Sequence, residues 1–91
     1  MKYVVHYESA PDVADRVADH LDAHRAHWQS FIDDGTLLMI GPFDPPSDGA
    51  LSVFRTREAA EEFARADPFV VHGLVARWTV HAWFEVLVPE D

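Results

Sequence analysis

The sequence predicts a ferredoxin-like α+β fold, in which one four-stranded antiparallel sheet carries two helices on the same face. Two observations lead to this prediction. Four short segments are rich in β-branched and aromatic residues, and two others repeat apolar residues at the spacing of a helix face. These segments occur in the order strand, helix, strand, strand, helix, strand, which is the order of a split βαβ unit. At 91 residues, the chain is expected to form a single domain over residues 1–91.

The first two predicted elements occupy the N-terminal third of the chain. Residues 2–8, KYVVHYE, are predicted to form a strand because they are rich in Val and Tyr. A helix is predicted from about Pro11, which suits a first helical turn, to about Asp34, where Gly35 supplies a left-handed cap. One face of this helix carries a stripe of residues expected to pack inward: Val13, Val17, Leu21, His24, Trp28, Phe31 and Ile32.

The rest of the chain is predicted to complete the sheet and add the second helix. The segments are, in order, a strand at 36–43, a strand at 50–56, an amphipathic helix at 57–66, a further helical turn within 67–74 and a long strand at 75–88. Helices cover only one face of such a sheet, yet the second and last strands carry large apolar residues on both faces. A monomer would expose that second face as an apolar patch, so we expect a homodimer that pairs through the open sheet face.

Composition and charge exclude several classes of partner. The formal net charge is −9, so the chain would be repelled by a phosphate backbone and nucleic-acid binding is not expected. There is no cysteine, which excludes disulfides, thiolate chemistry and zinc sites built from cysteine. The longest apolar runs are too short to span a membrane, and the N-terminus lacks the pattern of a secretory signal. A cytoplasmic protein that does not bind membranes is the expectation.

Three of the six histidines cluster within two turns of the first helix, at His20, His24 and His27. His20 and His24 are four residues apart, which is a spacing found in some metal sites. No HExxH pattern accompanies them, and no second ligand cluster occurs elsewhere in the sequence, so no metal is expected. His27 and His20 lie off the apolar stripe, whereas His24 lies on it.

The position of His24 allows two interpretations. The first is a buried core histidine whose ring is hydrogen-bonded to a backbone carbonyl, since a buried imidazole needs a partner. The second is a functional residue paired with a carboxylate beside an open pocket, and Asp67 is the best-placed candidate. Asp67 also has a structural explanation, because an Asp before Pro68 suits the cap of a helix that begins with proline. One carboxylate can serve both purposes.

The segment HRAHWQSFIDDGTLLMIGPF, followed by EAAEEFARADPFVVHGL, resembles the YciI-like (YCII-related) family. The matching features are His24 eleven residues before Gly35, then Gly41 and Pro42 at the end of a strand, the acidic, alanine-rich helix, and DPF followed by Gly73. The resemblance covers nearly the whole chain, from KYVVHY to WFEVL. It implies a dimeric α+β barrel, in agreement with the pattern of predicted elements.

The resemblance also implies a histidine–aspartate active pair, which falls on His24 and Asp67, and a pocket segment, which falls on Gly41 and Pro42. The sequence departs from the family pattern in two places. An Arg-Pro that normally precedes the histidine is replaced by LDA at residues 21–23, and the loop after Gly-Pro is short. Both changes affect the substrate contacts that the resemblance implies, and neither affects the pair.

A His–Asp pair without a nucleophile suits proton transfer, because imidazole titrates near neutrality and an aspartate can fix its tautomer. No phosphate-binding glycine loop or dinucleotide fingerprint occurs, so no cofactor is expected. The sequence therefore predicts cofactor-independent elimination or isomerisation of a small cyclic or aromatic substrate. The alternatives are a non-catalytic ligand-binding or sensor module and a structural partner of another enzyme. The residues expected to line the apolar pocket are Tyr7, Trp28, Met39 and Phe69.

Overall fold

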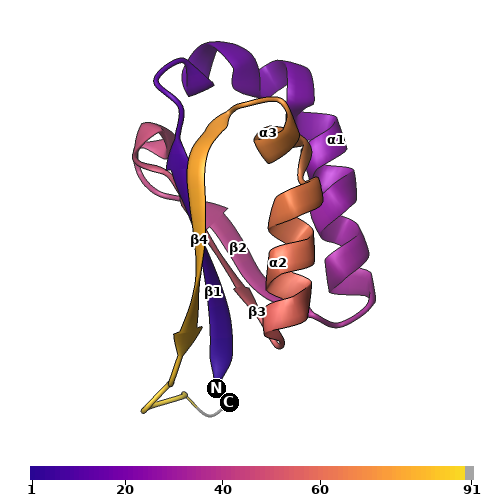
Figure 1. Cartoon of the computed structure of the whole chain (residues 1–91), viewed down its shortest axis with the longest axis vertical. Helices are drawn as coiled ribbons and strands as arrows, with labels where there is room; N and C mark the ends of the chain where they lie inside the picture. The colour runs from indigo at the N-terminus through magenta and orange to yellow at the C-terminus, as the bar shows by residue number, and fades with distance from the viewer. Residues whose placement is uncertain (90–91) are drawn as a thin grey trace.

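The computed structural model describes residues 1–89, which form one four-stranded antiparallel sheet with the helices on one face (Figure 1). The strands are β1 (Lys2–Ser9), β2 (Leu37–Pro42), β3 (Ala50–Phe54) and β4 (Val75–Trp83), and the helical segments are α1 (Val13–Asp33), the 3-10 turn η1 (Pro46–Asp48), α2 (Arg57–Ala66) and α3 (Pro68–Val71). The strand order across the sheet is β2-β3-β1-β4, which confirms the predicted ferredoxin-like arrangement. Within residues 1–89, no helix is both long enough and apolar enough to cross a membrane.

The ends of α1 show how the local sequence sets the helix. The helix begins at Val13, two residues later than predicted, because Pro11 and Asp12 form a turn that precedes it. At the other end Gly35 has a φ of 84° and its N–H donates to the carbonyl of Ile32, as expected of a left-handed cap. The chain then turns directly into β2.

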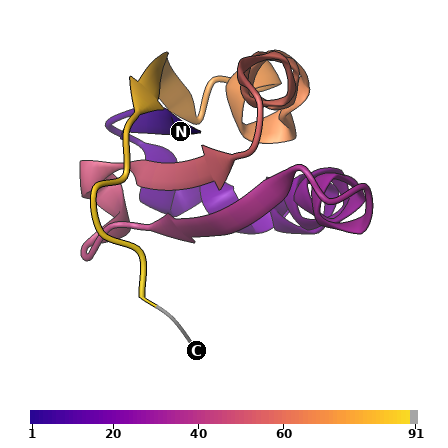
Figure 2. The same ribbon diagram turned by 90° about the horizontal axis from the view of Figure 1, so that it is seen from below.

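The prediction that the last strand extends to residue 88 is wrong, since β4 ends at Trp83. Trp83 pairs with Lys2, the first residue of β1, so the chain beyond Trp83 has no neighbouring strand to bond with. Glu85 anchors the segment instead, because its carboxylate lies 2.7 Å from the Lys2 ammonium nitrogen. The hydrogen bonds from Lys2 and from the N-terminal ammonium lower the pKa of Glu85 to about 2. Figure 2 shows the segment leaving the end of β4.

The hydrophobic core lies between α2 and the sheet. Phe54 on β3, Phe63 on α2 and Val5 on β1 are fully buried there. The rings of Phe54 and Phe63 have centroids 5.1 Å apart, and Phe31 from the end of α1 packs edge-on against both. Small alanines on the inner face of α2 let this helix approach the sheet closely. The core is therefore concentrated at one end of the sheet, which leaves the other end for a cavity.

The apolar stripe of α1 is only partly core, although the sequence predicts that all of it packs inward. Phe31 is buried, but Leu21 is 41% exposed and Ile32 is 42% exposed. Val13, Val17 and Leu21 face a cavity between α1 and the sheet rather than packed side chains. Helical spacing identifies the face of α1 that turns toward the sheet. It does not tell whether the space between that face and the sheet is filled by side chains.

A bulge in β2 changes which residues face the helices. Leu37 pairs with Phe54 and Met39 pairs with Val53, so one extra residue lies between these two pairs on β2. Leu37 and Ile40 consequently share the helix-facing side, while Met39 lies on the open side and is 59% exposed. The expectation that Met39 lines the pocket is therefore wrong.

Gly49, which follows η1, cannot carry a side chain without moving the backbone. A Cβ at this position would lie 2.0 Å from the carbonyl oxygen of Tyr7, and its φ of 117° is one that L-residues rarely adopt. We expect Gly49→Ala to lower the free energy of unfolding by at least about 3 kcal/mol, measured by urea denaturation. Gly35→Ala is the matched control, because Gly35 also has a positive φ but faces open space. Its expected cost is about 1–2 kcal/mol, and equal costs for the two variants would contradict the steric argument.

Candidate active site

Asp67 is the centre of the candidate site and is completely buried between α2 and α3. It is the N-cap of α3, where its Oδ1 accepts the backbone N–H of Phe69 at 3.1 Å and Pro68 occupies the first helical position. The same oxygen lies 2.8 Å from Nδ1 of His24, and Oδ2 accepts the hydroxyl of Tyr7 at 2.7 Å. Three donors from three separate elements thus converge on one buried carboxylate, which is how a buried charge is made tolerable.

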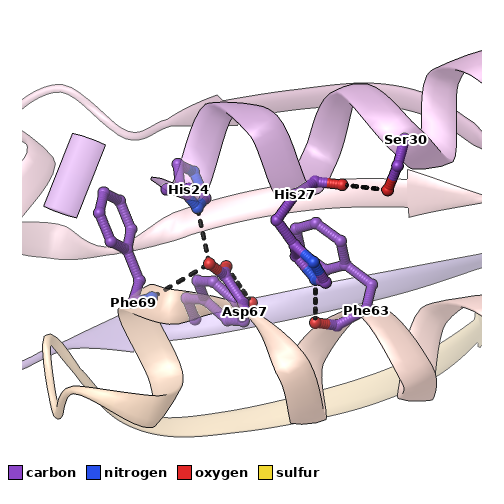
Figure 3. A network of polar contacts seen from close by, with 7 residues as sticks. His24, His27, Ser30, Phe63, Asp67 and Phe69 are labelled. Atoms are coloured by element: carbon purple, nitrogen blue, oxygen red, sulfur yellow. Dashed lines mark hydrogen bonds and ion pairs between the residues drawn. The ribbon is translucent and has the colours of Figure 1, made fainter. Parts of the chain in front are cut away.

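His24 projects from the middle of α1 toward Asp67, as Figure 3 shows. An ionised carboxylate can only accept hydrogen bonds, so Nδ1 of His24 carries the proton and donates it. In the neutral ring Nε2 is then the basic nitrogen, and within residues 1–89 it has no hydrogen-bond partner. The His24 side chain is 13% exposed and lines the cavity. The pair therefore presents a proton acceptor of defined tautomer to a space that a small molecule can enter.

Two aromatic residues hold the pair in place. The ring of Phe69 stacks on the His24 imidazole, with centroids 3.8 Å apart and an interplanar angle of 8° (Figure 3). Tyr7 supports the carboxylate from the sheet side. Burial, and then the charge and hydrogen bond of Asp67, raise the pKa of the Tyr7 hydroxyl above its usual value. Tyr7 thus remains a neutral donor, and its hydroxyl is committed to Asp67 rather than to a ligand.

The cavity beside His24 has a volume of about 370 Å³, which is within the range of small-molecule sites. It lies between α1 and the sheet, and Pro46 of η1 and Phe69 of α3 also line it. Its lining is mostly aliphatic and aromatic. The residues that line it are Tyr7, Ser9, Val13, Val17, Leu21, His24, Arg25, Trp28, Ile40, Gly41, Pro42, Pro46, Gly49, Ala50, Leu51, Ser52, Phe69, Leu74 and Val75.

The structure places the residues singled out in the sequence around this cavity. Gly41, Pro42, Trp28 and Phe69 line it together with Tyr7, and Asp67 lies behind the wall, in contact with His24. Asp67 makes both expected contacts at once, since one of its oxygens caps α3 and bonds to the histidine. The hydrogen-bond partner of His24 is a carboxylate, and not the backbone carbonyl that the first interpretation expects.

A histidine bonded to a backbone carbonyl does occur on α1, at the half-buried His27. Its Nε2 is 2.9 Å from the carbonyl of Phe63, to which it donates (Figure 3). Its ring packs against those of Phe31 and Phe63. The expectation that His27 lies off the packed face is therefore wrong. His20 stacks on His72, with ring centroids 4.4 Å apart. Among residues 1–89, no group of three or more His, Asp or Glu side chains is placed to hold a metal ion.

Three polar residues of the cavity wall, Ser9, Arg25 and Ser52, are absent from the set predicted from the sequence. Arg25 directly follows His24 on α1 and is exposed. Ser52 lies on β3 within the apolar segment ALSVF, where it pairs with Val5 and Ile40. The sequence does contain a signal for Ser52, because burying a serine in an apolar strand costs free energy unless its hydroxyl has a hydrogen-bond partner.

Comparisons with known proteins agree with this architecture. The family model of the YCII-related domain matches residues 1–84. Protein YciI of Escherichia coli O6:H1 and that of Shigella flexneri are each 30% identical over 97 aligned residues, covering 94% of this chain and 99% of theirs. A solved structure with the same fold is the 5-chloro-2-hydroxyhydroquinone dehydrochlorinase of Burkholderia phenoliruptrix, in complex with 2,5-dihydroxybenzoquinone. The TM-score is 0.73 and the sequence identity 21%, and the match covers 92% of this chain and 94% of that chain. With its match over residues 1–84, this chain belongs to the YCII-related family.

Proposed function

We propose that this chain is a small cytoplasmic enzyme that transfers protons on a small cyclic or aromatic substrate, without a cofactor, by means of His24 and Asp67. The observation that carries the proposal is the 2.8 Å bond between Nδ1 of His24 and the buried Asp67 carboxylate, at the wall of an apolar cavity. A structural histidine does not need a buried carboxylate and an open cavity on opposite sides of its ring. A general base needs both.

The proposed reaction begins with a C–H bond beside a carbonyl group of the substrate. Nε2 of His24 takes the proton, and the electron pair of that bond moves toward the carbonyl oxygen to give an enolate. Asp67 stabilises the imidazolium that forms. In an elimination, the enolate restores the carbonyl and expels a leaving group from the next carbon with its electron pair. In an isomerisation, the imidazolium returns the proton to a different carbon.

The shape and lining of the cavity support a ring as the substrate. Trp28 and Phe69 provide flat aromatic surfaces, and Val13, Val17 and Leu21 add aliphatic side chains to the α1 wall. The structurally similar dehydrochlorinase was solved with a quinone, which is a ring that carries oxygen atoms. That likeness supports a ligand of the same size and chemical class.

The test uses two probes that lose the same proton and give the same product. Cyclohex-3-enone isomerises to cyclohex-2-enone, and 3-hydroxycyclohexanone eliminates water to give the same product. Both reactions begin with loss of a proton from C2, the carbon between the carbonyl group and C3. Formation of the conjugated enone is followed by absorbance, and exchange of the same proton in D₂O is followed by NMR. We expect exchange above the buffer rate in the wild-type protein and none above it after His24→Ala. Exchange at the buffer rate for the wild type would remove the support for this chemistry.

The alternative function is a ligand-binding or sensor module, and the size of the cavity is the observation that favours it. A cavity of about 370 Å³ can hold a small ring whether or not a proton moves. This function predicts that the probes shift the NMR signals of the cavity residues and are recovered with no deuterium incorporated.

We also propose that the chain is a homodimer that pairs through the open face of the sheet. Met39 is 59% exposed on this face, Trp83 is 47% exposed and Leu51 is 38% exposed. The charge distribution favours a second copy as the partner. Glu8 is the one carboxylate among the residues of the four strands, and it pairs in register with Arg77. Two copies of a chain with a net charge of −9 can meet at this face without strong repulsion.

Met39→Glu is expected to convert the dimer into a monomer, because it would bury two carboxylates at the paired sheets. The measurement is molar mass by light scattering during size-exclusion chromatography, at about micromolar concentration. Val71→Glu is the matched control, since Val71 is 63% exposed on α3, on the helix side of the sheet. A monomeric wild type, or a Met39→Glu variant that remains dimeric, would contradict the proposal.

A further inference from the structure

Ser52 is a buried polar residue that the His24–Asp67 pair does not use. It is 4% exposed, and it lies on the helix-facing side of β3 in register with Val5 and Ile40. It also lines the cavity, where it belongs to the sheet wall while His24 belongs to the α1 wall. A serine at this position places a hydroxyl among aliphatic neighbours, which costs free energy unless the hydroxyl has a partner.

The hydroxyl of Ser52 has no such partner among residues 1–89. Within the same residues, every side-chain nitrogen or oxygen that is fully enclosed has a hydrogen bond. The Ser52 hydroxyl is therefore not fully enclosed, and the open space that Ser52 borders is the cavity. The other hydroxyls of the wall are committed, since Tyr7 donates to Asp67 and Ser9 donates to the carbonyl of Pro46.

We propose that Ser52 orients the ligand by a hydrogen bond to an oxygen substituent on its ring. A hydroxyl both donates and accepts, so the class of ligand it fits is a ring that carries a hydroxyl or carbonyl group. The opposed walls then have separate tasks. Ser52 holds an oxygen on the sheet side, and Nε2 of His24 faces the ring from the helix side. This inference rests on the proposed function, because it assumes that the cavity is where the ligand binds.

The test compares phenol and toluene, which have nearly the same shape and differ in one hydroxyl group. Their affinities are measured by following the amide signals of the cavity residues by NMR in the wild-type protein, Ser52→Ala and Ser30→Ala. Ser30 is the control, because its hydroxyl donates to the carbonyl of His27 at the far end of α1. We expect the preference for phenol over toluene to fall by about 3- to 10-fold in Ser52→Ala and to stay unchanged in Ser30→Ala.

Thermal unfolding separates this role from a structural one. Because the hydroxyl has no protein partner, Ser52→Ala is expected to have a Tm at or above that of the wild type. A fall of about 4–8 °C would indicate a lost internal hydrogen bond and overturn the proposal. An unchanged phenol preference in Ser52→Ala, or no response of the cavity amides to either probe, would also overturn it. A Ser52-dependent preference in a protein that exchanges no substrate proton would uphold this inference while contradicting the proposed catalysis.

Discussion

Replacing His24 with alanine is expected to lower the rate of substrate proton exchange by about 10²–10⁴-fold, which is the usual contribution of a positioned general base. The variant loses the basic Nε2 at the cavity wall, and the remaining lining residues offer no group of similar basicity in the same place. Asp67 keeps two of its three donors, the Tyr7 hydroxyl and the Phe69 N–H, so the fold is expected to persist. The loss of one hydrogen bond to the carboxylate should cost about 1.5–3 kcal/mol.

Two further variants separate catalysis from stability. His24→Gln can still donate an amide N–H toward Asp67 but has no base, so we expect the same loss of exchange with a smaller loss of stability. His27→Ala removes a histidine from the same helix and breaks its bond to the carbonyl of Phe63. It should be destabilised and should still exchange the substrate proton. A full rate in His24→Ala or in His24→Gln would rule out His24 as the base.

Replacing Asp67 with asparagine is expected to affect both the chemistry and the fold. With its amide group turned toward His24, Asn donates to Nδ1 and gives up the bond from the Phe69 N–H. This would move the ring proton to Nε2 and block the basic nitrogen in the cavity. We expect the exchange rate to fall by about 10²–10⁴-fold. Long-range ¹H–¹⁵N NMR of the imidazole shows which nitrogen carries the proton, and it should report Nδ1–H in the wild type and Nε2–H in the variant.

The stability of Asp67→Asn should fall because three donors lose an ionised acceptor. Hydrogen bonds to charged groups contribute about 1.5–3 kcal/mol each, and removal of one partner of a buried pair costs about 3–5 kcal/mol. Tyr7→Phe is the control for the tautomer, since it removes one of the donors but leaves the bond between His24 and Asp67 intact. It should be destabilised while His24 keeps its Nδ1–H form. An unchanged tautomer in Asp67→Asn would contradict this prediction.

Much of the fold could be predicted from the sequence because local signals agree with one another. Gly35 marked the end of α1, and the position of Asp67 before Pro68 marked the start of α3. The errors occurred where a residue's position depends on a neighbour that is distant in sequence. The end of β4 depends on where β1 begins, and the side on which Met39 lies depends on a bulge in β2. Periodicity along one segment carries neither piece of information.

The candidate site was predictable only in part, for a similar reason. The helical position of His24 indicated that it faces inward, and Asp67 was the best-placed carboxylate to pair with it, in agreement with what the resemblance to the YCII-related family implies. The bond between Tyr7 and Asp67 spans 60 residues, and nothing in either local sequence indicates it. Ser52 is the opposite case. A serine within an apolar strand is visible in the local sequence, but only the cavity beside it shows what its hydroxyl faces. A tertiary structure is needed to tell an open wall from a packed one.

The three bonds to the Asp67 carboxylate have a consequence for the evolution of the family. Active-site residues are often a burden on stability, so a lineage that no longer needs the reaction tends to lose them. Asp67 is different, because it caps α3 and ties α1, β1 and α3 together whether or not a substrate is present. Selection for folding alone would retain it. Under the proposed function, a relative that has kept the aspartate but replaced the histidine would keep the fold without the base, and the histidine would be the more informative marker of activity.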